Sequence, residues 1–250
     1  DVPAIFVADP FLLRQDGAWC LFFEVMNERT YKGEIALAVS TDGRAWDYRG
    51  IVLAEPFSLS YPHVLRWRGE VYMVPDGFEH DHVQLYRADP FPTRWRPVAT
   101  LLEGRFADAT LFRSGGRWWM LACDPFTNAV LRLFRADRLT GPWQEHPQSP
   151  IVRDDPGSAR PAGPVVEWRG GLVRFAQVCS PRYGSGVRAF EITRLTPDEY
   201  AERPAAGPPL QPAEPGAWNS SAMHHLCAHR LDGGGWIAAM DGHDHPSYRG

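Results

Sequence analysis

The feature that most constrains the fold of this chain is an internal repeat, in which a short apolar run leads through a glycine-containing turn into an aromatic-rich run. Apolar and polar residues alternate on both sides of the turn, which predicts a β-hairpin. The copies begin at Asp9 (DPFLLRQDGAWCLFFE), Tyr61 (YPHVLRWRGEVYMVPD), Asp108 (DATLFRSGGRWWMLACD), Ala162 (AGPVVEWRGGLVRFAQ) and, more weakly, His224 (HHLCAHRLDGGGWIAAMD). Five copies predict five related structural units.

A second pattern follows each of the first four copies: a third strand-like run, a polar turn and an aromatic residue that opens a fourth run. These aromatic residues recur about every 50 residues, at Trp46, Trp95, Trp143 and Tyr200. Four strands per unit at this period are typical of a β-propeller; a β-sandwich with accidental internal similarity is the alternative. The 23 glycines and 23 prolines argue against a helical bundle. We therefore predict an all-β, five-bladed β-propeller with four-stranded antiparallel blades, as one domain over residues 1–250.

The fifth unit is incomplete in the sequence, because only two strand-like runs follow His224. Propellers often close by letting a segment from one terminus complete the last sheet, so that no long sheet edge stays open. The eight residues before Asp9, DVPAIFVA, have the composition of a strand. We expect them to supply one strand of the fifth blade.

Charge and composition exclude several classes of function. The chain holds 26 Lys and Arg against 30 Asp and Glu, a net charge of −4 without a basic run, which argues against a nucleic-acid partner. No apolar stretch approaches the roughly 18 residues of a membrane span. The cysteines show no paired spacing, so we expect them to pack as small apolar side chains in a reducing, cytoplasmic protein. They are Cys20, Cys123, Cys179 and Cys227.

Carboxylates are the strongest candidates for chemistry. Asp9 opens the inner strand of the first unit, and Glu24 closes the antiparallel strand beside it, so both reach the same end of that sheet. Asp76 closes the equivalent strand of the second unit, Asp108 opens the third, and Asp241 has the matching place in the fifth. Each of them either caps a turn or pairs with an arginine, or else shares a pocket with another acid. Two carboxylates with different pKa values are what hydrolysis of a glycosidic bond requires.

Other polar side chains near the same strand ends are candidates for binding a substrate. Arginine and histidine can hold a phosphate or carboxylate group. The motif His-Asp-His at residues 80–82 and 243–245 also leaves a metal ion in a central channel open, although a metal needs three or four convergent ligands. We predict no resident cofactor. The predicted substrate-binding residues are Asp76, His63, Arg160, Arg174, Gln177, His224, His225 and Asp241.

The run FVADPFLL followed by GAWCLFFE resembles the opening blade of five-bladed glycoside hydrolases of the arabinanase, xylosidase and invertase groups. This resemblance implies that Asp9 acts as base or nucleophile, and that Asp108 tunes a pKa or holds a sugar hydroxyl. These hydrolases place a general-acid Glu before Gly-Pro in the fourth blade, where this chain has Ala162. Since alanine cannot donate a proton, Glu24 or Asp76 would have to act as the acid, and we assign this role to Glu24.

A closer resemblance is to the N-terminal domain of plant glucosamine inositolphosphorylceramide transferases and their bacterial relatives. It covers about residues 5–245 and is carried by FVADPFLL, KGEIALAVSTDGRAW, SLSYPHVLRWRGEVYMVPDG, LYRADPFPTRW and RPAGPVVEWRGGLVRFAQ. It implies a sugar or glycoconjugate as partner and a sugar-transferring module in a separate downstream domain. Three functions stay open: action on a glycosidic or related bond, non-catalytic carbohydrate recognition in a transferase pathway, and an unrelated reaction on a specialised metabolite.

Overall fold

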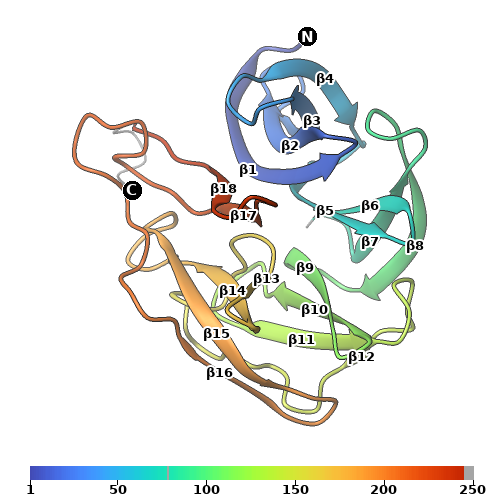
Figure 1. Cartoon of the computed structure of the whole chain (residues 1–250), viewed down its shortest axis with the longest axis vertical. Helices are drawn as coiled ribbons and strands as arrows, with labels where there is room; N and C mark the ends of the chain where they lie inside the picture. The colour runs from blue at the N-terminus through green and yellow to red at the C-terminus, as the bar shows by residue number, and fades with distance from the viewer. Residues whose placement is uncertain (78, 245–250) are drawn as a thin grey trace. The chain divides into compact units, whose positions relative to one another are not determined.

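The computed structural model describes residues 1–77 and 79–244, and these residues form β-strands, turns and connections without an α-helix (Figure 1). This confirms the all-β prediction. The described strands make four four-stranded sheets and one two-stranded sheet. The chain divides into two compact units. Unit 1 holds Asp1–Ala109 and Cys227–Ala239, and unit 2 holds Thr110–Leu226 and, of the later described residues, 240–244.

Unit 1 contains two complete four-stranded sheets, each with its strands in chain order. The first sheet consists of β1 (Ala4–Gln15), β2 (Ala18–Asn27), β3 (Lys32–Ser40) and β4 (Asp47–Leu53). The second sheet consists of β5 (Ser60–Trp67), β6 (Glu70–Asp76), β7 (His82–Ala88) and β8 (Trp95–Glu103). A shared apolar core joins them, because fully buried side chains such as Phe11, Phe22, Leu37 and Met73 belong to one cluster.

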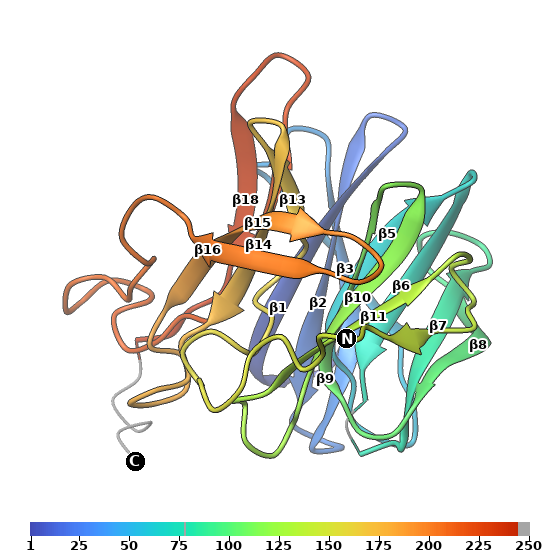
Figure 2. The ribbon, with the colours of Figure 1, turned by 90° about the horizontal axis from the view of Figure 1, so that it is seen from below.

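Unit 2 contains the other two four-stranded sheets, and their strands also follow in chain order (Figure 2). One sheet consists of β9 (Ala107–Ser114, which starts in unit 1), β10 (Arg117–Cys123), β11 (Leu131–Ala136) and β12 (Gln144–Glu145). The other consists of β13 (Val166–Trp168), β14 (Gly171–Gln177), β15 (Val187–Leu195) and β16 (Tyr200–Pro204). In each four-stranded sheet, neighbouring strands follow one another along the chain, which is the strand order of a β-propeller blade.

The repeat found in the sequence corresponds to hairpins between the first two strands of each four-stranded sheet. Each has a two-residue loop in which both residues have positive φ, as a type I′ turn requires. Glycine takes the second place because it carries no Cβ. The four loops are Asp16–Gly17, Arg68–Gly69, Gly115–Gly116 and Arg169–Gly170.

The fifth copy of the repeat forms only a two-stranded sheet among the described residues, β17 (Leu226–Arg230) with β18 (Trp236–Met240). The expectation that the residues before Asp9 complete this sheet is wrong for residues 4–8. They lengthen β1 instead, with Ala4 opposite Asn27 of β2. The physical reason is continuity: β2 extends far enough to pair with them, so their backbone hydrogen bonds are satisfied locally.

Candidate functional site

Three first strands, β1, β5 and β9, carry a non-glycine residue in the left-handed region seven residues before the hairpin turn. These residues are Asp9 (φ 52°), Tyr61 (φ 44°) and Asp108 (φ 53°). The pairing of β1 with β2 and of β5 with β6 shifts register at the first two positions, which marks a β-bulge. Such a conformation costs about 1–3 kcal/mol and concentrates at functional sites. The bulges turn these side chains away from the regular alternation of the strand.

The four candidate acids of unit 1 are buried rather than solvated. The exposed fraction is 6% for Asp9, 7% for Glu24, 6% for Asp76 and 1% for Asp108. Carboxylates at this depth need hydrogen-bond donors, because a buried charge without partners is strongly destabilising. Backbone amides of the left-handed residues supply two of these donors. The Tyr61 amide donates to Asp9 Oδ2 (3.2 Å), and the Asp108 amide donates to Asp76 Oδ2 (3.3 Å).

These two hydrogen bonds link acids of neighbouring repeats in unit 1. Asp9 contacts the first residue of the second repeat, and Asp76, which pairs with Ser60 at that same strand end, contacts Asp108 of the third. Glu24 pairs with Ala8, next to Asp9. The structure therefore places Glu24 opposite the residue before Asp9 and joins Asp76 to Asp108 through a hydrogen bond. The arrangement can hold polar groups of a ligand and can exchange a proton with it.

The space around Glu24 depends on a glycine. A Cβ at Gly33, on the neighbouring strand β3, would lie 2.7 Å from Glu24 Oε1 and 2.4 Å from the Leu59 carbonyl oxygen. Any larger residue at position 33 would displace both. His63, in contrast, is packed like a core residue: it is 2% exposed, and its ring lies edge-on to Phe11 with centroids 5.4 Å apart.

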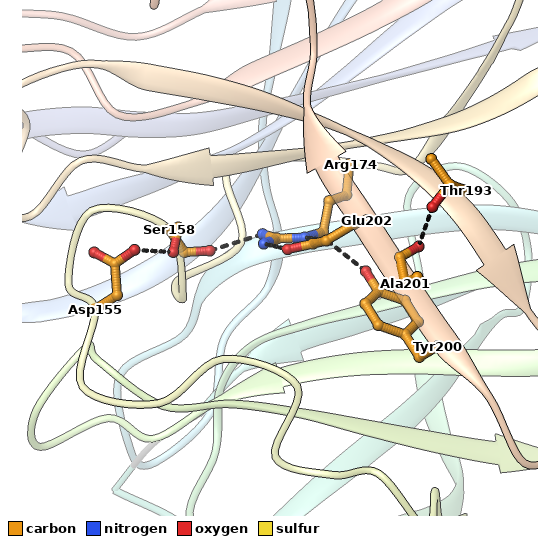
Figure 3. A network of polar contacts seen from close by, with 7 residues as sticks. All are labelled: Asp155, Ser158, Arg174, Thr193, Tyr200, Ala201 and Glu202. Atoms are coloured by element: carbon orange, nitrogen blue, oxygen red, sulfur yellow. Dashed lines mark hydrogen bonds and ion pairs between the residues drawn. The ribbon is translucent and has the colours of Figure 1, made fainter.

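In unit 2, the predicted substrate-binding residue Arg174 lies in an internal network (Figure 3). Its guanidinium is 1% exposed, forms a two-point ion pair with Glu202 at 2.5 Å, and donates to the Ser158 carbonyl oxygen at 2.8 Å. The Tyr200 hydroxyl donates to the same carboxylate. Burial opposes the charge on Arg174, but Glu202 and Tyr200 hold the pKa of the guanidinium above its usual value. This geometry gives Arg174 a role in joining β14 to β16.

Two further predicted binding residues are also held by neighbours in unit 2. Gln177 is 1% exposed and donates through Nε2 to the Pro161 carbonyl oxygen at 2.9 Å. Arg160 is half-buried and donates to Asn128 Oδ1 at 3.0 Å. Contact with a substrate by Arg174, Gln177 or Arg160 stays a prediction.

His224 and Asp241 form a close pair in unit 2. Nδ1 of His224 lies 2.7 Å from Asp241 Oδ2, and Asp241 Oδ1 accepts the amides of His224 and His225, both at 3.0 Å. Burial opposes ionisation of Asp241, but the charge and hydrogen bonds of His224, with the charge of His225, hold its pKa below the usual range. Asp241 therefore orients the imidazole of His224, while His225 is fully buried.

The lowered pKa of Asp241 predicts a pH-dependent contribution to stability. A carboxyl group whose pKa is depressed on folding stabilises the protein above its unfolded pKa, and the contribution disappears as the pH falls through the folded pKa. We expect Asp241→Asn to lower the thermal midpoint near neutral pH, and the gap to wild type to narrow below about pH 4. Thermal unfolding followed by circular dichroism across this range measures the gap. A gap that widens on acidification would contradict the assignment.

The sequence analysis missed an exposed aromatic residue beside this pair. Tyr183 is 47% exposed, its ring lies edge-on to His224 with centroids 5.0 Å apart, and the Arg160 guanidinium lies 5.3 Å from its centroid. The chain has ten tryptophans, and some of those in the repeats, such as Trp118 at 4% exposed, are buried core residues, whereas Tyr183 lies in a connection outside the repeat. The run Pro181–Gly184, with an aromatic residue between turn formers, was the available signal.

The two His-Asp-His motifs differ in setting. His80 and His82 lie edge-on to each other with centroids 5.0 Å apart, and Asp81 between them pairs with Arg105 at 2.6 Å. His243 pairs with Ala222 through the backbone, whereas His245 lies outside the described residues. A metal ion in a central channel therefore stays a prediction from the sequence.

The chain matches a family model over residues 1–243, that of glucosamine inositolphosphorylceramide transferase 1, N-terminal. The chain belongs to this family. It is 40% identical over 98% of its length to glucosamine inositolphosphorylceramide transferase 1 of Oryza sativa subsp. japonica, and 32% identical over 96% to that of Arabidopsis thaliana. The chain covers 34% and 32% of these two relatives, so the family member described here spans about a third of their length.

Solved structures identify the fold of this family member. The catalytic domain of the GH62 α-L-arabinofuranosidase of Coprinopsis cinerea matches with a TM-score of 0.75 and 14% identity, over 99% of this chain and 87% of that one. At this level of identity the likeness shows the fold alone, which is a β-propeller. Within residues 1–77 and 79–244, no helix combines the length and apolarity needed to cross a membrane.

Proposed function

We propose that this family member is a carbohydrate-active β-propeller module that binds a sugar or glycoconjugate through the buried acids of unit 1. The observation that carries the proposal is the placement of Asp9 and Asp108. Both are buried aspartates in a strained left-handed conformation, at equivalent positions of two repeats. Tyr61 shares this backbone conformation within the apolar core, so the support for a functional role is that the other two equivalent positions carry a buried carboxylate.

The role proposed for each acid combines the resemblance to five-bladed hydrolases with its neighbours in the structure. Asp9 acts as base or nucleophile on a glycosidic or related bond, with Glu24 beside it as the acid. Asp108 orients the substrate together with Asp76, whose carboxylate the Asp108 amide already contacts. The names of the relatives and the hydrolase-like fold support a sugar as the ligand.

The test uses a panel of chromogenic aryl glycosides with wild type, Asp9→Asn and Asp108→Asn. Asparagine at position 9 keeps an oxygen that can accept the Tyr61 amide, so the fold is retained while the charge is removed. We expect kcat/KM to fall by about 10²–10⁴ in Asp9→Asn, the range for loss of a proton-transfer group. Asp137→Asn is the matched control, because Asp137 is 84% exposed and pairs with Arg117 at the surface. Full turnover by Asp9→Asn would contradict the assignment.

A second candidate function is non-catalytic recognition of a carbohydrate in a transferase pathway. It is favoured by Ala162, which takes the place of the acid and is completely buried, so no proton donor stands there. The relatives are named as transferases, and the chain spans about a third of them. Binding of a saccharide by wild type without cleavage of any aryl glycoside would support this candidate over hydrolysis.

We also propose that β17 and β18 belong to a fifth blade and that residues 1–250 act as one domain. The hairpin turn of this sheet is a five-residue connection, unlike the two-residue turns of the other four, but the strand order is the same. A cooperative single unfolding transition by calorimetry would support one domain. Cytoplasmic location and the lack of a resident cofactor stay predictions from the sequence.

A further inference from the structure

An exposed surface of unit 2 combines an aromatic ring with several cationic or polar side chains, and no role has been assigned to the ring. We call this surface the Tyr183 platform. It consists of Arg160, Arg182, Tyr183 and His224. Nearly half of Tyr183 is exposed, although Arg160 and His224 both contact its ring. A rigid aromatic ring with polar groups around it is the usual platform for the C–H face of a sugar.

The platform is held by two segments whose backbones lie side by side. Ser185 and Met223 form a parallel bridge, and the Met223 amide donates to the Gly184 carbonyl oxygen at 2.9 Å. A Cβ at Gly184 would lie 2.8 Å from the Ala222 Cβ, so this close approach requires a glycine. The Tyr183 backbone is therefore fixed next to the segment that carries His224, which keeps the entropy cost of ordering the ring low.

The positive groups of the platform are held in place by defined partners. Arg182 donates to the Ser221 carbonyl oxygen at 3.0 Å, and Arg160 donates to Asn128 at 3.0 Å. His224 is oriented by Asp241, whose side chain is 6% exposed. The Asp241 carboxylate is therefore buried. Arg182 and Tyr183 are exposed, and the His224 side chain is 16% exposed. Guanidinium groups favour carboxylate and phosphate ligands because they present several N–H donors in one plane.

We propose that the Tyr183 platform binds a saccharide that carries an anionic substituent, a carboxylate or a phosphate. The sugar ring stacks on Tyr183, and Arg160 and Arg182 hold the anionic group. The proposal rests on the proposed saccharide function and adds to it a ligand class and a place in unit 2. It does not require that the unit 1 acids cleave a bond.

The experiment is an NMR titration of the full chain with four probes: D-glucose, D-glucuronate, D-glucose 6-phosphate and inorganic phosphate. We expect at least one anionic sugar to bind about tenfold more tightly than D-glucose, and more tightly than inorganic phosphate. Tyr183→Ala weakens that binding about tenfold, whereas Tyr183→Phe, which keeps the ring, stays within about twofold. Arg160→Gln lowers affinity for the anionic sugar toward that for D-glucose.

The outcomes separate this proposal from the unit 1 site. If an anionic sugar binds wild type and Tyr183→Ala equally, or if inorganic phosphate binds as tightly as the sugar phosphate, the platform proposal is overturned. Failure of all four probes also overturns it, while cleavage or binding of the neutral aryl glycosides still supports the unit 1 acids. Circular dichroism checks that each variant is folded. We expect the Tyr183 variants to fold, because this side chain is exposed. Loss of anionic-sugar binding in Tyr183→Ala, with retention in Tyr183→Phe, establishes the platform.

Discussion

Replacing Glu202 with Gln is expected to lower the free energy of unfolding by about 3–5 kcal/mol, the usual effect of removing one partner of a buried ion pair. The substitution removes the carboxylate that pairs directly with the Arg174 guanidinium, a side chain that is 1% exposed. Arg174 also donates to the Ser158 carbonyl oxygen, which is neutral and offsets little of the charge. Urea denaturation of wild type and variant measures the difference, provided that both show the same m value.

A matched control lies on the same hairpin. Arg203 and Glu191 pair at 2.7 Å across β15 and β16, but their side chains are 70% and 33% exposed. Glu191→Gln should therefore change the free energy of unfolding by less than about 1 kcal/mol, because exposed ion pairs contribute little. Equal effects of the two substitutions would show that the burial of Arg174 does not decide the energetics of this sheet.

The second large effect is expected from Gly163→Ala. Gly163 has φ +128°, and a Cβ there would lie 2.0 Å from the Leu226 carbonyl oxygen and 2.9 Å from its carbon. The Leu226 amide donates to the Ala162 carbonyl oxygen at 2.8 Å, so the two backbones cannot separate without losing this bond. We expect a loss of about 3 kcal/mol or more in unfolding free energy, and a low yield of folded protein. Chemical denaturation and soluble yield measure it.

Gly170→Ala separates the effect of a positive φ from the effect of the close contact with Leu226. Gly170 also has a positive φ, +82°, but a Cβ there has no atom within 4 Å. This variant should lose only the 1–2 kcal/mol or so of a left-handed non-glycine residue. If Gly163→Ala loses no more than Gly170→Ala, the backbone at position 163 has room to move, and the contact with Leu226 is not what requires glycine.

The strand content of the fold could be predicted because its signals are local. A hairpin with a two-residue turn brings alternating residues together within about twenty positions of the chain, so the pattern is readable in one copy and repeats in the next. The same locality placed Asp9 beside Glu24 and Tyr61 near Asp76. The prediction that the residues before Asp9 pair with the fifth sheet was wrong for residues 4–8, which pair with β2. The sequence alone does not distinguish these two partners.

The contacts that decide each side chain's role are non-local, and the sequence does not encode them in any short pattern. No short pattern in the sequence indicates that Arg174 pairs with Glu202, which lies two strands away in the sheet. Tyr183 contacts His224 and Arg160, which lie far from it along the chain, and these contacts cannot be predicted from the sequence around Tyr183. The left-handed conformation of Asp9 and Asp108 was also invisible, because aspartate adopts it only occasionally and the surrounding sheet selects it.

The left-handed position before each hairpin has a consequence for how such modules diversify. Aspartate occupies it in the first and third repeats and tyrosine in the second, with nearly the same φ. The main chain there therefore adopts the same conformation with an acidic or an aromatic side chain. A substitution at such a position therefore changes the chemical group that the inner strand presents without requiring a different backbone conformation, so chains with the same architecture can carry different groups there.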